Sequence, residues 1–488
     1  MTQDEFVSEL IGQAKRSWEH YWAALPDEQR LRLSGMEAEF EDISRRLVEG
    51  LWRLLGENLE TLAVEVAGRC ALGCRRERRK DSIGVDVLGH RIEVPCTYFY
   101  CRDCHQGASP VRQWLGVESG GVSLGLERAL TDLTTRMTFG DATDSMREHH
   151  GQDIDRTKAE RVTYAVARDA ELYLAKRRDE AHDKLLSGER TGVEQLVFTA
   201  DGGAVPVGTM SRPKDGSGPK TEIRQLPKGT RSISGREARF ISVHRAGSTA
   251  GRVVDCHIAP YDTPEFTGAR MFAAAAEAGL GETSRIHGVF DMGKWIHSQF
   301  EEQFFAYDHS ACADIMHVAE YLIDAGRVVV GEPKAVPWGM EHKRRMLGGE
   351  IDEVLARLGQ HVCAAPCQKD ERGACLVRVA ERYLTNNRSY MENYEDFMVR
   401  NLPVGSGEAE SGIRHIIKRR ADVAGAWTEE HAALLLALLA LRASGWWDDF
   451  WAWRSEKDKV AWRTRQTSGE KVLFRNKRHR APSLVKAA

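Results

Sequence analysis

The sequence lacks long apolar runs, a leader-like start, an internal repeat and an excess of charge of one sign. Its 488 residues carry a formal net charge of −3, which excludes a uniformly basic coat. The most apolar stretch, residues 432–441, is too short to span a bilayer and is typical of a buried helix. Residues 1–5 do not show the charged-then-apolar layout of a secretory leader. We therefore expect a cytoplasmic protein with no membrane partner.

The chain does contain enough apolar residues for several cores, and its charge is unevenly placed. With 42% apolar content, a chain of this length is sufficient for about two to four domains. Residues 456–488 hold ten Lys or Arg and three acids, a net of +7 (10 − 3). This basic tail fits either an arm for a polyanionic partner or solvated disorder, and the composition leaves both open.

Ten cysteines in a reducing compartment favour metal binding or burial over disulfides. Two close pairs, Cys70 with Cys74 and Cys101 with Cys104, flank alternating runs that a turn at residues 88–90 would join as a hairpin. Two such pairs brought together by a short sheet predict a structural Cys₄ zinc ribbon.

The zinc prediction has open alternatives. The first pair is separated by three residues instead of the usual two, and free buried cysteines would give the same composition. Cys96 or His105 could replace one of the four ligands. A basic run beside the first pair suits contact with DNA phosphates, and its members are Arg75, Arg76, Arg78, Arg79 and Lys80.

Helical patterns occupy residues 1–65 and again residues 120–190. In the second region a turn at residues 151–153 leads into a helix whose start carries Arg156, Lys158 and Arg161. Helices joined by a short Gly-containing turn, the last with a basic start, resemble a DNA-reading helix-turn-helix. Surface charge on an ordinary helical bundle is the alternative.

From residue 194 the pattern changes to that of an α/β domain. Strand-like runs at 196–200, 240–244 and 253–259 predict an antiparallel meander, and a helix at 264–278 before a strand at 286–291 predicts a crossover. Residues 208–235, rich in Gly, Pro, Ser, Lys and Arg, are predicted as a long basic loop that lies along DNA or forms an exposed hairpin tip. Residues 313–400 read as mostly helical.

Three acidic residues stand out because of what surrounds them. Asp201 and Asp291 each end an apolar run close to glycine, and Glu410 lies just inside a helix opened by residues 405–407. Carboxylates at strand ends beside glycine can point into a cleft. Three that converge would hold one or two divalent cations. Taken singly, the aspartates could be turn residues, and Glu410 could favour the helix dipole or pair with Arg414.

Several ordered motifs between residues 196 and 450 resemble those of DDE transposases of bacterial insertion sequences, in the Mutator-like branch. The stretches that carry the resemblance are Thr199-Ala200-Asp201-Gly202, Phe290-Asp291-Met292-Gly293-Lys294-Trp295-Ile296, Asp314-Ile315-Met316-His317-Val318 and Leu402-Pro403-Val404-Gly405-Ser406-Gly407-Glu408-Ala409-Glu410-Ser411. The resemblance implies an RNase H-like catalytic domain with a helical insertion. An N-terminal zinc ribbon and a helical DNA-binding region are also similar to this group.

The resemblance also implies roles for particular residues. Asp201, Asp291 and Glu410 would be catalytic and hold Mg²⁺ or Mn²⁺, with Glu410 preferred to Glu408 because the family's glutamate precedes a serine. Asp314 and His317 would be an accessory pair, although an Asp and a His one turn apart are more often structural. Positive charge for DNA would come from the same helix as Glu410, through Arg414, Lys418, Arg419 and Arg420.

The predicted fold class is therefore multi-domain α/β, an RNase H-like mixed sheet flanked by helices with an all-helical insertion. The predicted regions are an N-terminal helical region (1–65), a zinc ribbon (66–115), a helical DNA-binding region (120–190), the catalytic domain in two parts (194–335 and 401–455), the helical insertion (336–400) and the basic tail (456–488).

The predicted activity is metal-dependent cleavage of transposon ends and their transfer into target DNA, at the nucleoid. The partner would be double-stranded DNA, and synapsis of two ends would need a homodimer or higher oligomer. Two alternatives stay open: a structure-specific nuclease of the same fold, and a transposase-derived DNA-binding regulator that no longer cuts.

Overall fold

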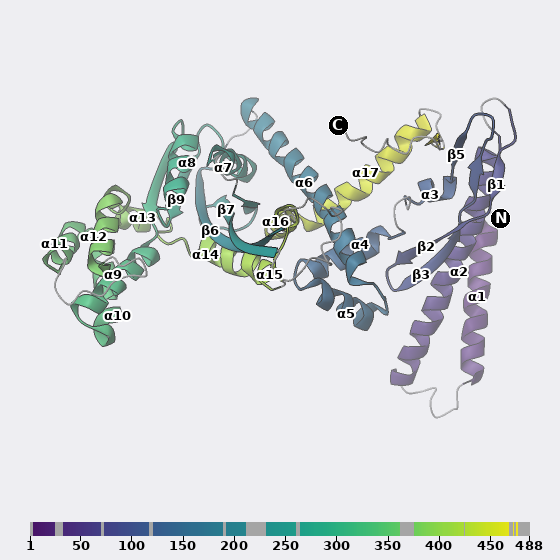
Figure 1. Ribbon diagram of the computed structural model, residues 1–488, viewed down its shortest axis with the longest axis horizontal. Helices are drawn as coiled ribbons and strands as arrows, with labels where there is room; N and C mark the ends of the chain where they lie inside the picture. Colours follow the sequence, from purple (N-terminus) through teal and green to yellow (C-terminus); the bar gives the residue numbers. More distant parts are fainter. Residues whose placement is uncertain are drawn as a thin grey trace, which may run out of the picture. The chain divides into compact units, whose positions relative to one another are not determined.

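A computed structural model describes residues 3–24, 33–69, 73–116, 121–188, 192–210, 231–259, 264–361, 375–423, 425–467, 472 and 475–476 (Figure 1). The chain is mixed α/β with several sheets. Contacts divide it into two compact units. The first comprises Met1–Thr134, Phe139–Thr163 and Trp451–Ala488, and the second comprises Thr135–Thr138 and Tyr164–Phe450.

The helices of the first unit confirm the helical patterns read from the sequence. Near the N-terminus lie α1 (Gln3–Ala24) and α2 (Leu33–Ala67). After the sheets come α3 (Pro110–Trp114), α4 (Leu124–Thr134), α5 (Phe139–His150) and the first part of α6 (Arg156–Leu186). Helix α17 (Trp447–Thr467) runs on from the second unit into the first.

The first unit contains two small sheets. The predicted hairpin is confirmed as β2 (Ser82–Val87) paired antiparallel with β3 (His90–Pro95). Gly89 makes the tight turn possible, because its φ of 80° lies in the left-handed region that favours glycine. The apolar side of the hairpin packs with Ala63 and Ala67 of α2. The second sheet has the order β1 (Glu77–Arg79), β4 (Tyr98–Tyr100), β5 (Gln106–Ala108) and β11 (Arg475–Asn476).

A five-stranded sheet organises the second unit. Its order is β10 (Asp308–Ala313), β9 (Arg285–Phe290), β6 (Gln195–Met210), β7 (Arg231–Arg245) and β8 (Val253–Ile258). Strands β6, β7 and β8 form the predicted antiparallel meander, and β9 returns parallel to β6 after helix α7 (Pro264–Ala278). Both predictions are confirmed.

The register of β6 and β9 determines what lies at the end of the sheet. Thr199 pairs with Val289. Asp201 and Asp291 each follow these partners by two residues, so Asp201, within β6, lies at the level where β9 ends and Asp291 follows it. The core beside them includes Phe198 and Phe290 with Phe300 of α8 (Lys294–Phe304), at ring centroid distances of 5.0–5.8 Å.

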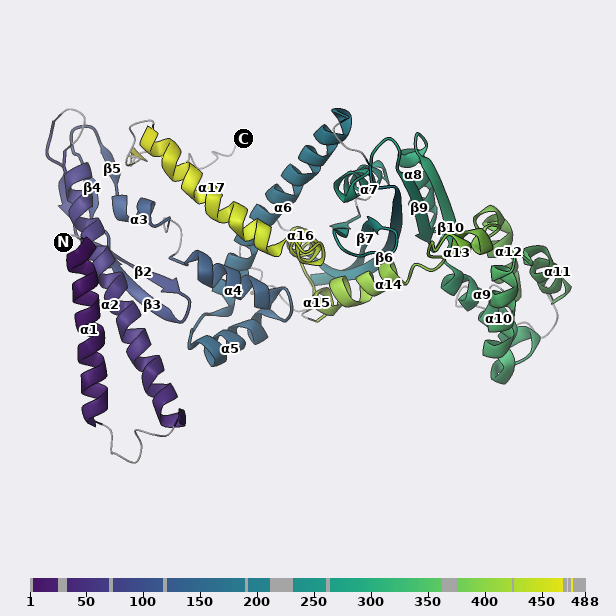
Figure 2. The same cartoon turned by 180° about the vertical axis from the view of Figure 1, so that it is seen from behind.

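A helical block follows β10 and confirms the mostly helical prediction for residues 313–400. It contains α9 (Ile315–Val329), α10 (Glu332–Leu347), α11 (Ile351–His361), α12 (Leu376–Asn386), the 3₁₀ turn η2 (Arg388–Tyr390) and α13 (Tyr394–Val399). Figure 2 shows α9, α10, α11 and α12 grouped together beside β10. Their apolar faces join the core of the sheet through residues such as Val318, Leu322 and Leu384.

The chain then returns to the sheet through α14 (Gly407–Gly412), a π-helical segment η3 (Ile413–Lys418) and α15 (Arg419–Ala421). Helix α16 (Glu429–Ala443) follows, and its residues 434–441 are all buried, as the sequence predicts for this apolar stretch. In the described part of the chain, no helix combines the length and apolarity needed to cross a membrane.

The prediction of a loop over residues 208–235 is partly wrong. Strand β6 continues to Met210 and β7 begins at Arg231, so the hairpin is longer than its apolar part. The backbone of Trp427 also pairs with β6, accepting from Gly208 at 2.7 Å and donating to Pro206 at 3.0 Å. Residues 233–235 are exposed, which explains why no apolar alternation marks this strand. Residues 211–230 lie outside the described residues.

Candidate functional site

The two aspartates are held by the backbone that follows them. Oδ1 of Asp201 accepts from the N–H of Gly202 at 2.6 Å, and Oδ1 of Asp291 accepts from the N–H of Gly293 at 2.8 Å. Met292, between Asp291 and Gly293, has a φ of 65°, an uncommon value for a residue with a side chain. The turn at Met292 brings the Gly293 N–H to the Asp291 carboxylate, which it holds by a hydrogen bond.

Glycines bring the helix of Glu410 close to the same sheet. A Cβ atom added to Gly203 would lie 2.6 Å from Ile413, and one added to Gly412 would lie 2.3 Å from the ring of Phe240. Real Cβ atoms do not approach so closely, so only glycine permits this packing of α14 and η3 on β6 and β7. Glu410 itself is exposed.

The electrostatics of Asp201 show which groups lie around it. The pKa of Asp201 is raised to about 6: burial is the largest cause, the negative charges of Asp291 and Glu410 add to it, and the Gly202 N–H and His317 act in the opposite direction. Three predicted acids and the predicted histidine therefore share one electrostatic environment, although they come from β6, β9, α14 and α9. The ligand atoms of these acids and the histidine are not all within 4.8 Å of one another. Among the described residues, the one group that meets this limit is Cys74, Cys101 and Asp103.

Glu408 and Glu410 lie two residues apart on one helix and have different surroundings. Glu408 accepts from Ser242 at 2.6 Å, lies 2.8 Å from His244 Nε2, and is 3.2 Å from Arg252. Burial opposes the charge of Glu408, but the hydrogen bonds from His244 and Ser242 outweigh it and lower the pKa of Glu408 to about 2. Glu408 therefore anchors α14 to β7, while the exposed Glu410 adds negative charge near Asp201.

Asp314 is a positioning residue. It is buried, its Oδ1 accepts from the Met316 N–H at 2.7 Å as the N-cap of α9, and its Oδ2 accepts from the Ser406 hydroxyl at 2.6 Å. One carboxylate oxygen thus caps α9, and the other joins the residue after β10 to the segment before Glu410. These contacts suit a structural role, and the accessory role of Asp314 beside the site stays a prediction.

His317 packs with two tyrosines, one of which contacts the backbone of Asp291. The His317 ring lies 5.7 Å from Tyr383, which stacks on Tyr321 at 4.1 Å. The Tyr383 hydroxyl donates to the Asp291 carbonyl at 3.1 Å. Burial raises the pKa of Tyr383, with Tyr321 and Asp291 adding to the effect. Sequence reasoning missed both tyrosines, because helical tyrosines carry no signal beyond core packing.

The donor set of this site suits a hard divalent cation. Asp201, Asp291 and Glu410 offer carboxylate oxygens, which Mg²⁺ prefers. The raised pKa of Asp201 reflects the mutual repulsion of these charges as well as burial. A bound cation would relieve that repulsion, so these residues fit Mg²⁺ or Mn²⁺.

The basic residues beyond Glu410 divide into two groups. Arg414, Lys418 and Arg419 are exposed. Arg420 is only 1% exposed and lies over the ring of Trp427 at 4.8 Å, and burial lowers the pKa of Arg420 to about 10. Arg420 therefore packs against the domain, and the three exposed residues are better placed to meet a phosphate from solvent.

The cysteine-rich segment of the first unit brings together part of the predicted zinc set. The Sγ atoms of Cys74 and Cys101 and a carboxylate oxygen of Asp103 all lie within 4.8 Å of one another. Cys104 is not a member of this group, and Cys70 lies outside the described residues. The Cys101 N–H donates to Gln106 at 2.9 Å, which closes the turn that presents the thiol. Two thiols with a nearby carboxylate fit zinc.

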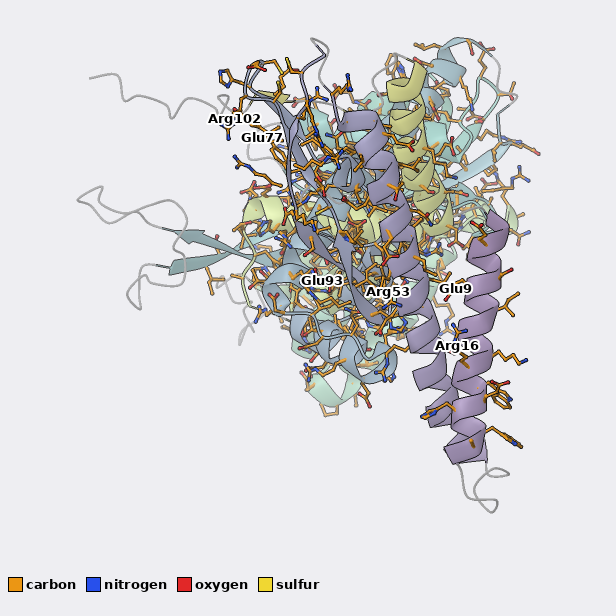
Figure 3. The ribbon with its side chains drawn as sticks, turned by 90° about the vertical axis from the view of Figure 1, so that its right-hand side faces the viewer. Glu9, Arg16, Arg53, Glu77, Glu93 and Arg102 are labelled. Carbon is orange, nitrogen blue, oxygen red and sulfur yellow. The ribbon has the colours of Figure 1, made fainter. Side chains whose placement is uncertain are left out.

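The alternative ligands Cys96 and His105 have other contacts. Cys96 is buried and accepts from Arg112 Nε at 3.2 Å, and burial raises the pKa of the Cys96 thiol. His105 has a φ of 55° and its Nδ1 lies 3.2 Å from the Tyr100 hydroxyl. Neither belongs to the close group. At this end of the unit, Arg102 pairs with Glu77 of β1 (Figure 3).

The predicted DNA-binding residues of the first unit also differ in exposure. Arg75, Arg78, Arg79 and Lys80 are exposed. Arg76 is buried and donates to the carbonyls of Ala67 and Arg69 at 3.2 and 2.5 Å, so its predicted phosphate contact does not fit.

At the start of α6, Arg161 is exposed and Arg156 pairs with Glu160 at 3.0 Å. Lys158 forms an ion pair with the buried Asp86 of β2. Lys158 therefore ties α6 to the hairpin, and its predicted contact with DNA does not fit this pairing.

Comparison with known protein families finds no matching family model, and no curated protein matches the sequence.

Proposed function

We propose that the chain is a metal-dependent DNA transposase that cleaves and joins phosphodiesters with Asp201, Asp291 and Glu410. The observation that carries the proposal is the shared electrostatic environment of these three acids, which come from two adjacent parallel strands and a helix packed on the same sheet. Remote carboxylates gathered in this way are unfavourable without a cation, which gives them a physical reason to be a metal site.

The sheet supports an RNase H-like assignment. Its order, β10-β9-β6-β7-β8, with an antiparallel meander and two parallel strands added beside β6, is the arrangement expected for that fold. The helical block between β10 and α14 supports the idea of an insertion between the second aspartate and the glutamate. Fold alone does not fix function, so the proposal depends on the acids.

The residues of the site have separable tasks in this proposal. Asp201, Asp291 and Glu410 would hold the cation, and the Asp314–Ser406 hydrogen bond positions the segment that carries Glu410. The chemistry that a divalent cation supplies when bound is activation of the attacking oxygen and stabilisation of the leaving one. Arg414, Lys418 and Arg419 would hold the DNA strand against the repulsion of the acids.

The reaction would take place in two balanced steps. Water attacks a phosphodiester at the transposon end, and the P–O bond to the 3′ oxygen breaks to leave a free 3′-hydroxyl. That hydroxyl then attacks a phosphodiester of the target, and the displaced oxygen leaves with a proton. One phosphodiester replaces another in the second step, so no ATP is needed. The exposed basic residues of the first unit and its predicted zinc ribbon would contribute affinity for DNA.

The decisive experiment uses the full chain and a labelled duplex that carries the ends of the DNA element around its gene. With Mg²⁺ we expect nicks at the element ends and joined products. Asp201→Asn should reduce nicking roughly 10²–10³-fold, the usual loss for one preorganised electrostatic group, while DNA binding stays. Asp324→Asn, on the exposed side of α9, is the matched control and should nick normally.

Three outcomes would contradict the proposal. Nicks without joined products would favour a structure-specific nuclease. Binding without nicking under Mg²⁺ or Mn²⁺ would favour a regulator. Normal nicking by Asp201→Asn would remove Asp201 from the site.

A further inference from the structure

A second feature of the same helical segment is a small cavity with an unusual lining. The cavity has a volume of about 290 Å³ and lies entirely within the second unit. None of its ten lining residues is acidic, and six are Arg or His. These six are Arg136, Arg252, His415, Arg419, Arg420 and Arg442.

We infer that this cavity is a binding site for a phosphodiester of the DNA strand that occupies the carboxylate site. The inference rests on the proposed function and names a contact that the acids do not make. Guanidinium groups recognise phosphate oxygens through paired N–H donors, and several of them converging around one cavity form an anion site.

Two of the arginines lie over aromatic rings, and a third is held by a carboxylate and a backbone carbonyl. Arg420 lies over Trp427 at 4.8 Å and Arg442 lies over Trp447 at 4.6 Å. An aromatic ring attracts a cation but carries no net charge to cancel it. Arg252 is held by Glu408 at 3.2 Å and by the Ala443 carbonyl at 3.2 Å.

The burial of Arg420 makes the binding of an anion in the cavity more favourable. Arg420 is 1% exposed, and burial lowers the pKa of Arg420 to about 10, which means that the charged form is poorly solvated. A phosphate in the cavity would offset that cost, because opposite charges interact more strongly away from water.

The size of the cavity limits what it can hold. A water molecule occupies about 30 Å³ of liquid, so 290 Å³ corresponds to about ten waters. That space suits one phosphate with part of its sugar and is too small for a duplex. The cavity would therefore take a single point of a strand that continues outside it.

The helix that carries Glu410 gives the distance between the two sites. His415 and Arg419 follow Glu410 by five and nine residues on the continuous segment formed by α14, η3 and α15. At about 1.5 Å per residue this spans roughly 7–14 Å. One strand of DNA rises about 3.4 Å per nucleotide, so the phosphate in the cavity would lie roughly two to four nucleotides from the reacting one.

The test is a double-mutant cycle in which one arginine of the protein and one phosphate of the DNA are neutralised, singly and together, and the DNA affinity is measured. The DNA is the duplex nicked by the wild-type chain, with one phosphate at a time replaced by a neutral methylphosphonate. Affinity is measured without metal for the wild type, Arg419→Gln and Arg442→Gln. Arg357→Gln, an exposed arginine of α11 outside the cavity, is the matched control. Each cavity variant should reduce the slope of log affinity against log salt by about one.

We expect the wild type to lose affinity when a phosphate two to four nucleotides from the nick is neutralised, and the cavity variants to be insensitive to that same change. Equal sensitivity of all proteins at every position, with nicking intact, would overturn the inference and leave the proposed function standing. A chain that neither binds nor nicks this duplex would overturn the proposed function itself.

A second arm identifies a different source of phosphate. Inorganic phosphate is titrated into the wild type and Arg419→Gln by calorimetry. Binding that the variant loses, together with unchanged DNA affinity, would mark a site for a free anion and contradict the assignment to a DNA strand.

Discussion

The two candidate metal sites of this chain are built in opposite ways. The carboxylate site takes its groups from β6, β9 and α14, which only the folded sheet brings together. The cysteine group, Cys74, Cys101 and Asp103, comes from one short segment whose turns place the ligands locally. The carboxylate site, whose groups come from remote parts of the chain, is expected to depend on the packing of the second unit. For the cysteine group, the folding of the surrounding segment is expected to depend on the bound metal, because its strands are short.

The largest effect should come from breaking the local site. Cys101→Ser should abolish zinc binding and unfold the sheet of β1, β4 and β5, because structural zinc contributes on the order of 10 kcal/mol to such small sites. Metal analysis and hydrogen exchange of these strands measure the effect. Cys375→Ser, in the second unit, is the control and should keep the metal. If Cys101→Ser retained zinc, Cys101 would not be a required ligand and the contrast between the two metal sites would be wrong.

The next effect separates two glutamates of one helix. Glu410→Gln should reduce nicking roughly 10²–10³-fold with little change in stability, since Glu410 is exposed. Glu408→Gln should instead destabilise the second unit by about 1–3 kcal/mol, because it weakens the contacts with Ser242, His244 and Arg252. Parallel nicking assays and urea unfolding compare them. If both variants lost activity equally without loss of stability, the division of roles would be wrong.

Acid should weaken the second unit through His287. This buried side chain of β9 donates from Nε2 to the Pro403 carbonyl at 2.9 Å, just before the segment of Glu410. Burial, together with the nearby Arg400 charge, lowers the pKa of His287 to about 4 despite that hydrogen bond. Between about pH 6.5 and 4 the unfolded chain binds a proton that the folded chain does not. Stability should therefore fall as pH falls through this window, by about 3 kcal/mol.

Urea midpoints measured across this pH range in the wild type and His287→Gln test the effect, and the variant should show a flatter dependence. His309→Gln is a control of opposite sign. Burial opposes the charge of His309, but the Tyr307 carbonyl and Glu301 outweigh it and raise the pKa of His309. An unchanged pH dependence in His287→Gln would contradict the assignment.

The smallest expected effect concerns the close approach of the helix to the sheet. Gly412→Ala should destabilise the second unit by about 1–3 kcal/mol and reduce nicking, because the new methyl group meets the Phe240 ring. Gly407→Ala, in the same helix, has open space around its Cβ position and should have little effect. Equal stability of the two variants would show that Glu410 does not depend on this packing.

Much of the second unit could be predicted because its strands are buried. Residues 196–200, 240–244 and 253–259 carry apolar runs, and these runs set the order of the meander and crossover. Strand β10 was missed because Asp308–Ala313 is short and contains small or polar residues. The outer half of β6 and β7 was missed because exposed strands carry no apolar alternation.

The sequence identified candidate acids more readily than it indicated the role of each residue. Asp201 and Asp291 were identifiable because each ends an apolar run close to glycine, although Asp201 lies inside the longer strand β6. The anchoring role of Glu408 depends on His244 and Arg252, which only the folded sheet brings near it. Likewise, Arg76, Lys158 and Arg420 are held by tertiary contacts that cannot be predicted from a run of basic residues in the sequence.

The π-helical turn after Glu410 has a consequence for how this chain could change. Residues 413–418 accommodate one more residue than a regular helix of the same span would need. Winding the same residues as a regular helix, with none deleted, would rotate every later side chain by about 100° about the axis. Arg419 would then face a different neighbour while Glu410 stayed in place. The phase between the acidic and basic parts of the segment is thus set by the length of one turn.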